Sequence, residues 1–348
     1  MTTPRPVSGN VALPEPLPAR PSNPGDTPFA TLTPERILDA VDALGFESNG
    51  RLLALNSYEN RVYRVGLEDG STLIAKFYRA ARWTNEAICE EHAFAQELAD
   101  AELPVVPPLQ VAGHTLQLDA DLRYALFPNR PGRAPELDDA DTLRWIGRFL
   151  GRIHARGGVA RFAHRAALTQ ARLGEESVRF VLAGDYLPGE LRPAYTSVAE
   201  AALAQVAATF EAVGPVRGLR LHGDCHHGNI LWTSAGPHFV DLDDCMQGPA
   251  VQDLWLLLSG DRADMTRQLT LLLAGYEEFR EFDHGELALI EALRTLRILH
   301  YVAWLARRWA DPAFPLHFPW FNTQRYWQDH VLALREQLAA MDEHSLSV

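Results

Sequence analysis

The stretch "LHGDCHHGNILWTSAGPHFVDLDD", residues 221–244, places a polar loop before two short apolar segments. Segments 229–233 and 237–241 are β-prone, and the Ser-Ala-Gly sequence at 234–236 supplies turn residues between them. A hairpin centred on Ala235 would set Asn229 opposite Asp241, with their Cα atoms about 5 Å apart, whereas a slip of one residue would break this pairing. An amide oxygen and a carboxylate are hard ligands that suit Mg²⁺ bound with nucleotide phosphates. The hairpin therefore predicts a magnesium site formed by Asn229 and Asp241.

The loop before this hairpin carries a candidate general base. Asp224 lies five residues before Asn229, and a carboxylate there can accept a proton from an attacking hydroxyl. The spacing Asp-x4-Asn, followed by an aspartate after the next strand, is that of kinase catalytic and metal-binding loops. Adjacent residues seldom converge on one tetrahedral zinc ion, and no spaced Cys or His pair completes a zinc set, so a catalytic loop is favoured. The zinc alternative would draw its ligands from His222, Cys225, His226 and His227.

Basic residues show a strong bias. Of the 32 lysine and arginine residues, Lys76 is the only lysine. Arginine replaces lysine on most solvated surfaces, but not where a compact ammonium must fit among phosphate oxygens. The single lysine is therefore a candidate phosphate ligand.

The first part of the chain predicts a small sheet. Residues 1–28 are rich in proline and lack apolar periodicity, which indicates a disordered tail. A short helix at 33–45 is followed by three β-prone segments, with Asp69-Gly70 as a hairpin turn before the third. This pattern places Lys76 on the third strand.

A helix expected over 83–100 supplies the partner of the lysine. Its apolar residues recur with helical spacing, and Glu91 falls within that apolar stripe. A carboxylate on the buried side of a helix needs a partner, and Lys76 lies on the preceding strand. The remaining glutamates at 86, 90 and 97 are expected on the opposite, solvent-facing side.

Beyond this helix the chain predicts a second lobe. A second hairpin ends near residue 128, and the Pro, Gly and charged residues of 129–141 are typical of a linker. Residues 142–348 are mainly helical around the 221–244 stretch. The expected fold class is α+β, with an N-terminal ATP-binding sheet lobe at 29–128 and a larger helical lobe, joined so that a ligand cleft lies between them.

Several strings resemble a known family. "HGDCHHGNI", "FVDLDD" and "QDLWLLL" are similar to the aminoglycoside phosphotransferase and choline kinase branch of the protein-kinase-like fold. Together with "LNSYENRVY", "AKFYR", "EEHAFAQEL" and "RRWADPAFP", they resemble the stress response kinase A family across about residues 30 to 325. The resemblance implies ATP- and Mg²⁺-dependent phosphorylation of protein serine or threonine in the cytoplasm, including autophosphorylation, within a stress response.

The same resemblance assigns roles to individual residues. It implies that Asp224 accepts the proton and that Asn229 and Asp241 hold Mg²⁺, with Asp241 also counted among the catalytic residues. It further implies that Lys76 contacts the ATP phosphates and pairs with Glu91. The loop "LNSYENRVY" would cover the phosphates, with Ser57 at the nucleotide. The sequence departs from ordinary protein kinases in lacking a glycine triad in this loop, and in having "HGD" for "HRD" and "DLD" for "DFG".

Two other functions fit parts of the pattern. A small-molecule kinase of the aminoglycoside or choline type would share every catalytic residue. A nucleotide-binding adaptor without turnover would need neither the base nor the metal pair, so the intact set argues against it.

Charge and cysteine content limit the remaining classes. The formal net charge of −13 argues against a nucleic acid or an anionic membrane as the main partner. The three cysteines are widely spaced, and no signal peptide or membrane-spanning apolar run is visible. We expect a cytoplasmic protein whose partners are ATP and protein substrates with serine or threonine acceptors.

Overall fold

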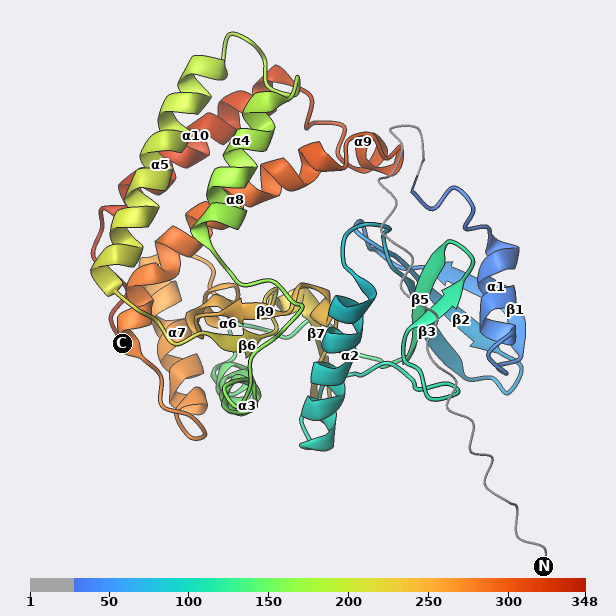
Figure 1. The fold of residues 1–348 in the computed structure, drawn as a ribbon. Helices are drawn as coiled ribbons and strands as arrows, with labels where there is room; N and C mark the ends of the chain where they lie inside the picture. Colours follow the sequence, from blue (N-terminus) through green and yellow to red (C-terminus); the bar gives the residue numbers. More distant parts are fainter. Residues whose placement is uncertain (1–27) are drawn as a thin grey trace, which may run out of the picture.

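The chain folds into two lobes (Figure 1). The computed structural model describes residues 28–348, so the predicted tail at 1–28 lies outside the described residues except for its last position. A small lobe is built on an antiparallel sheet, and a larger lobe is mainly helical. This is the α+β, two-lobed architecture predicted from the sequence.

The sheet lobe is built on five antiparallel strands in the order β1-β2-β3-β5-β4. Helix α1 packs its buried face against this sheet, and the Thr33 hydroxyl caps the helix by accepting the Arg36 amide. On the central strand β3, Lys76 pairs with Val62 of β2 and Ala125 of β5. The lysine is therefore held in the middle of the sheet, as its position on the third strand predicts. The elements are α1 Pro34–Asp42, β1 Ser48–Ala54, β2 Arg61–Leu67, β3 Thr72–Phe77, β4 Gln117–Asp119 and β5 Leu122–Pro128.

Helix α2 (Asn85–Asp100) packs against both lobes. Thr84 caps it, and the predicted apolar stripe is buried. Ile88 packs in a cluster with residues of the sheet lobe, whereas Phe94 and Leu98 belong to the main core of the helical lobe. The helix stands between the sheet and the helical lobe in Figure 1, so its position depends on contacts with both.

The helical lobe contains two short antiparallel strand pairs, β6 with β9 and the hairpin of β7 with β8. Its first helix, α3, begins at Ala140, two residues before the boundary expected at 142. The elements are α3 Ala140–Gly157, π-helical turn Ala171–Glu175, α4 Glu176–Ala183, α5 Arg192–Val213, β6 Leu219–Leu221, 3-10 turn His227–Asn229, β7 Ile230–Thr233, β8 Gly236–Phe239, 3-10 turn Leu242–Asp244, β9 Met246–Gly248, α6 Val251–Trp255, α7 Arg262–Tyr276, 3-10 turn His284–Leu289, α8 Ile290–Arg307, α9 Ala313–His317 and α10 Gln324–Met341.

The register of the β7–β8 hairpin differs from the expected one. Thr233 pairs with Gly236 and Ile230 pairs with Phe239, so the turn consists of two residues, 234 and 235. Asn229 is consequently next to Val240, whose amide donates to the Asn229 carbonyl at 3.0 Å. The predicted direct opposition of Asn229 and Asp241 is wrong by one residue, because a two-residue turn is tighter than the three-residue turn expected.

Helices α3 and α7 approach closely through glycines. A Cβ atom at Gly147 would overlap the Leu272 carbonyl, and one at Gly275 would overlap the Arg144 carbonyl. The atoms that each Cβ would overlap belong to the backbone, so no flexible side chain could move away to make room. The short distance between these two helices therefore depends on the absence of side chains at these glycines.

We expect Gly147→Ala to lower the free energy of unfolding by about 2 kcal/mol or more, because an added methyl group in a tightly packed contact forces the helices apart. Gly189→Ala is the matched control, since a Cβ at Gly189 meets nothing within 4 Å, and we expect it to change stability by less than about 0.5 kcal/mol. Urea unfolding measures both. Equal urea midpoints for the two variants would show that the close contact between α3 and α7 contributes nothing to stability.

Candidate active site

Lys76 lies at the centre of a cluster of carboxylates from both lobes. Its Nζ is 2.9 Å from Asp241 Oδ1, 3.4 Å from Asp243 Oδ1 and 3.8 Å from Glu91 Oε1. The lysine and Glu91 are both buried, and their 3.8 Å contact is the ion pair that the helix stripe predicts. Burial would lower the pKa of Lys76, but the charges of Asp241 and Glu91 raise it above its usual range. The ammonium group is therefore a fixed positive charge between the lobes.

Asp241 follows β8 in an unusual conformation. It has the left-handed backbone angles φ 60° and ψ 64°, which cost free energy for a residue with a Cβ. Its side chain is half exposed although it contacts Lys76. Desolvation raises the pKa of Asp241, but the charge and hydrogen bond of Lys76 hold it below the usual value. This carboxylate thus stays ionised beside Lys76 while about half of its side chain is exposed.

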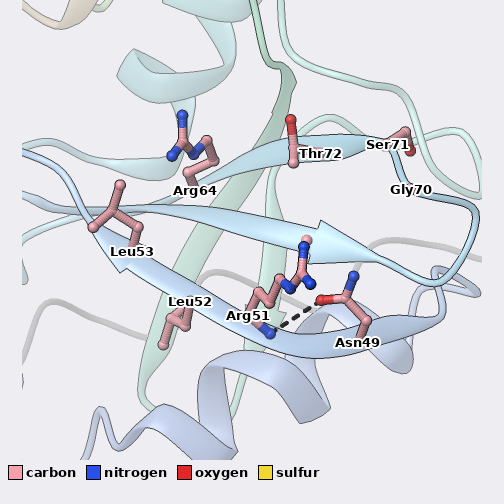
Figure 2. Close-up of a pocket in the computed structure, with 9 residues that line it drawn as sticks. Asn49, Arg51, Leu52, Leu53, Arg64, Gly70, Ser71 and Thr72 are labelled. Carbon is pink, nitrogen blue, oxygen red and sulfur yellow. Dashed lines mark hydrogen bonds between the residues drawn. The ribbon is translucent and has the colours of Figure 1, made fainter.

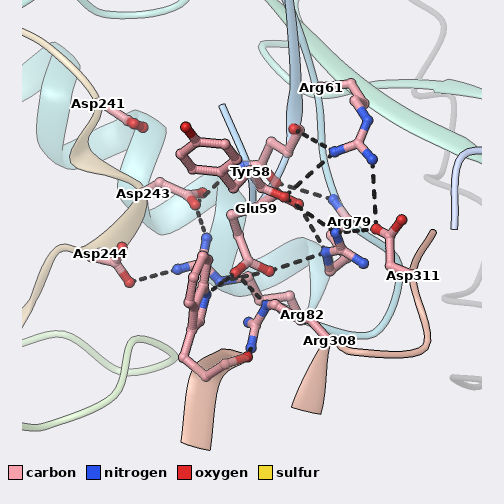
Figure 3. Close-up of polar contacts among 12 residues, drawn as sticks. Tyr58, Glu59, Arg61, Arg79, Arg82, Asp241, Asp243, Asp244, Arg308 and Asp311 are labelled. Carbon is pink, nitrogen blue, oxygen red and sulfur yellow. Dashed lines mark hydrogen bonds and ion pairs between the residues drawn. The ribbon is translucent and has the colours of Figure 1, made fainter. Parts of the chain in front are cut away.

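Asp243 anchors the turn after Asp241 to the sheet lobe. Its buried carboxylate accepts a hydrogen bond from Asn60 Nδ2 at 3.0 Å and pairs with Arg82. Arg82 also reaches Asp244, with Nη2 2.6 Å from Oδ1 (Figure 3). These contacts hold the 241–244 turn against the residues that flank β2 and β3.

The loop that precedes β2 is fastened to the helical lobe. Glu59 pairs with Arg308 at 2.6 Å and with Arg79 at 3.2 Å, and it accepts a hydrogen bond from Trp304. Arg79 also binds Asp311 at 2.7 Å (Figure 3). Ser57 is half buried in this loop, and no hydrogen bond of its side chain is found in residues 28–348. The loop lies beside the carboxylate cluster through Glu59 and its neighbours rather than through Ser57.

Asp224 lies on the helical-lobe side of the cluster. Its Oδ1 is 2.8 Å from Arg297 Nη1 on α8, and its Oδ2 is 3.4 Å from His226 Nε2. Burial raises the pKa of Asp224, but the imidazole of His226 and the guanidinium of Arg297 bring it well below the usual range. The backbone carbonyl of Asp224 accepts the Asn229 side-chain amide at 3.0 Å. The base candidate and the metal-ligand candidate are therefore joined in one loop.

A buried aspartate supports this loop from behind. The Asp253 carboxylate accepts the backbone amides of His222 and Gly223, both at 2.8 Å, and contacts His154 Nε2 at 3.0 Å. Asp253 is fully buried, and a buried charge requires such partners. His222 in turn contacts the Val240 carbonyl at 2.9 Å. Both side chains bind backbone groups of the loop and of the following strand's end, so both act on the loop's shape.

The donor set fits a small, hard cation. Asn229 uses its amide nitrogen in the contact with Asp224, which leaves its side-chain oxygen for a ligand. Asp241 has one oxygen on Lys76 and a half-exposed side chain. Mg²⁺ typically takes one or two protein carboxylates and completes its shell with water and phosphate oxygens. Within residues 28–348, no group of three His, Cys, Asp or Glu side chains converges as a metal site of its own.

The expectation that Glu90 faces solvent is wrong. Its carboxylate accepts the backbone amides of Ala163, His164 and Arg165 at 2.6, 2.7 and 2.7 Å. Arg165 is buried and lies 3.8 Å from Glu91. Glu97 is also paired, with Arg220 at 2.8 Å and Arg156 at 2.8 Å. The polar face of α2 therefore binds the helical lobe, which a single helix pattern does not reveal.

A separate hollow lies on the sheet lobe, away from these residues (Figure 2). It is lined by β1 to β3 and includes the side chains of Arg51, Leu53 and Arg64. None of its lining residues belongs to the carboxylate cluster. The chemistry therefore concentrates between the lobes and not in this hollow.

The site also contains residues that the sequence analysis missed. Arg297 is 73 positions from Asp224, and Asn60 is 183 positions from Asp243. Among 31 arginines, no spacing or motif distinguishes those at 82, 165 and 297. Asn60 stands within "LNSYENRVY", and the position of that loop is the one signal that pointed toward it.

The chain is similar to a known enzyme family and to kinases of other bacteria. Residues 51–290 match the model of the phosphotransferase enzyme family. The stress response kinase A of Escherichia coli K12 is 43% identical over 320 residues, covering 92% of this chain and 97% of that protein. A Salmonella typhimurium relative named serine/threonine protein kinase RdoA is also 43% identical, with the same coverage.

Solved structures show the same fold. The amicoumacin kinase hAmiN has a TM-score of 0.70 at 19% identity, covering 88% of this chain and 93% of that one. A microcompartment-associated aminopropanol kinase has a TM-score of 0.66 at 18% identity, covering 87% and 96%. These likenesses confirm the predicted kinase-like fold. No helix in the described part of the chain is long and apolar enough to cross a membrane.

We expect Glu91→Gln to lower phosphoryl transfer about tenfold or more at saturating ATP, because the neutral amide no longer holds Lys76 by charge. Glu86→Gln is the matched control, since Glu86 lies in the exposed first turn of the same helix. We expect the control to keep the parent rate. Steady-state kinetics, with circular dichroism to verify folding, measures both. A Glu91→Gln rate equal to that of Glu86→Gln would rule out this role for the ion pair.

Proposed function

The chain belongs to the phosphotransferase enzyme family, and we propose that it transfers the γ-phosphoryl group of ATP to serine or threonine hydroxyls of proteins, including its own. The observation that carries this proposal is the meeting of Lys76, Glu91 and Asp241 from the two lobes beside the Asp224 loop. A kinase activity is what the family and the kinase names of its 43% identical relatives support.

Each residue has a role that its surroundings favour. Lys76 binds phosphate oxygens, and Glu91 keeps the ammonium in place when Asp241 turns toward another partner. Asp224 accepts the proton of the attacking hydroxyl, because its carboxylate stays ionised beside Arg297. Asn229 and Asp241 would hold Mg²⁺, which neutralises charge on the phosphates when bound. The loop that contains Ser57 covers the nucleotide from the sheet lobe.

A protein acceptor is supported by the relatives rather than by the fold. The relatives at 43% identity are named stress response kinase and serine/threonine protein kinase. The solved kinases of amicoumacin and aminopropanol act on small molecules by name, but they are below 20% identical to this chain. Because the 43% identical relatives are named stress response kinase, we also propose a role in a stress response. A small-molecule acceptor is the alternative, and an assay of the labelled product distinguishes the two.

We place the reaction in the cytoplasm. Cys89, Cys225 and Cys245 are all free thiols, and burial raises the pKa of the Cys225 and Cys245 thiols above the usual value. Unpaired cysteines are typical of a reducing compartment, where ATP is also available. An adaptor without turnover is disfavoured, because a scaffold has no need for an ionised base beside a metal-ligand pair.

The acceptor assay uses the purified chain with γ-labelled ATP and Mg²⁺. Label recovered as phosphoserine or phosphothreonine supports the proposal. Label that appears only in an added aminoglycoside or choline would replace the protein acceptor with a small molecule. ATP binding without any transfer would leave the adaptor function.

The base and the metal ligand are separable by mutation. We expect Asp224→Asn to lower the transfer rate about 10²–10⁴-fold, the usual range for a positioned base, with Mg²⁺-ATP binding nearly unchanged. We expect Asp241→Ala to weaken Mg²⁺-dependent nucleotide binding itself, because a hard oxygen ligand is removed. Calorimetry and single-turnover kinetics distinguish the two effects. The opposite pattern would exchange the two roles.

A further inference from the structure

Arg297 contacts the base candidate Asp224 and has hydrogen-bond donors that Asp224 does not use. Its Nη1 is 2.8 Å from Asp224 Oδ1, and within residues 28–348 the side chain makes no other hydrogen bond or ion pair. The side chain is 48% exposed. A guanidinium carries five N–H donors, so the donors that Asp224 does not use are available for a further partner.

The position of Arg297 is also where an acceptor must bind. A hydroxyl that gives its proton to Asp224 has to come within about 2.6–3.2 Å of that carboxylate. Any acceptor in this pose lies against Arg297. Tyr301 is exposed one turn farther along α8, on the same helix face, and stacks on Trp304. The acceptor side of the site thus combines one guanidinium with aromatic rings.

We propose that Arg297 is a specificity-determining residue that selects acceptors with an acidic group, a carboxylate or a phosphate, next to the reacting hydroxyl. This inference rests on the proposed kinase function and names the acceptor class for the same site. The planar guanidinium binds carboxylates and phosphates through paired hydrogen bonds. The same positive charge repels an acceptor that carries an amine at this point.

One guanidinium in this protein already bridges two carboxylates. Arg36 holds Asp119 at 3.0 Å through Nε and Asp121 at 2.8 Å through Nη2. Arg297 has the same donors, and Asp224 uses one of them. An acidic group on the acceptor therefore binds the remaining donors while the hydroxyl points at Asp224. Binding of this kind positions the acceptor and adds no chemical step.

The test uses peptides with a single serine flanked on both sides by Asp, Asn or Lys. We expect the parent protein to favour the Asp peptide over the Asn peptide by about tenfold or more in kcat/KM, the effect of a charge-assisted hydrogen bond. The Lys peptide is expected to be the poorest. Arg297→Ala should reduce the Asp preference to about twofold or less, and Arg297→Glu should make the Lys peptide the best.

Two further variants separate charge from packing. Arg297→Lys keeps the positive charge but lacks the paired N–H donors of the planar guanidinium, so it should retain part of the preference for the Asp peptide. Arg307→Ala removes another exposed arginine of α8, whose contact is with the Glu176 carbonyl and not with Asp224, and it should keep the full preference. Equal rates for the Asp and Asn peptides in the parent protein, or an Asp preference that survives in Arg297→Ala, would overturn the inference.

Failure of the protein-kinase proposal can be distinguished from failure of the Arg297 inference. If no peptide is phosphorylated, the same variants are assayed with 3-hydroxypropionate and 3-aminopropanol, which differ in the sign of the charged group. Preference of the parent protein for 3-hydroxypropionate, lost in Arg297→Ala, supports the inference with a small-molecule acceptor. Preference for 3-aminopropanol, or transfer to neither compound, contradicts it.

Discussion

The ion pairs of Lys76 are the interaction on which the rest of the site depends. The lysine is fixed at the centre of the sheet, and its three carboxylate neighbours come from α2 and from the turn after β8. Buried carboxylates are costly unless paired, so the cluster forms only when sheet, helix and turn are brought together. This is the charge that we propose binds the phosphates of a nucleotide. Assembly of the two lobes and formation of the proposed phosphate site therefore occur together.

Arginines balance the remaining negative charge between the lobes. Arg82 and Arg165 hold the 241–244 turn, whereas Arg79 and Arg308 hold Glu59. Arginine suits these positions because its planar fork makes several directed contacts at once. Lysine stands at the single point where a compact ammonium faces a metal-ligand candidate. The composition of the chain, with one lysine among 32 basic residues, thus agrees with the proposal that arginines act as structural cations and Lys76 as the phosphate-binding one.

Sequence reasoning located the groups that local patterns define. The Lys76–Glu91 pair followed from a lone lysine and a helix stripe, and the Asp224 loop followed from spacing. The hairpin register was missed, because the length of a turn depends on backbone geometry that Ser-Ala-Gly leaves open. Glu90 was placed in solvent, because its partners are backbone amides 73 to 75 residues away. Arg297 was missed for the same reason: long-range contacts of one arginine among many leave no periodic signal.

The most direct test of the central claim is the transfer rate of Lys76→Arg. This variant keeps the positive charge but replaces a compact ammonium with a wider, flat guanidinium. If the shape of Lys76 is needed among carboxylates and phosphates, the variant melts cooperatively like the parent protein yet loses most of its phosphoryl transfer from labelled ATP. A folded Lys76→Arg protein that retains transfer within about twofold of the parent would contradict the claim that the site is built around this lysine.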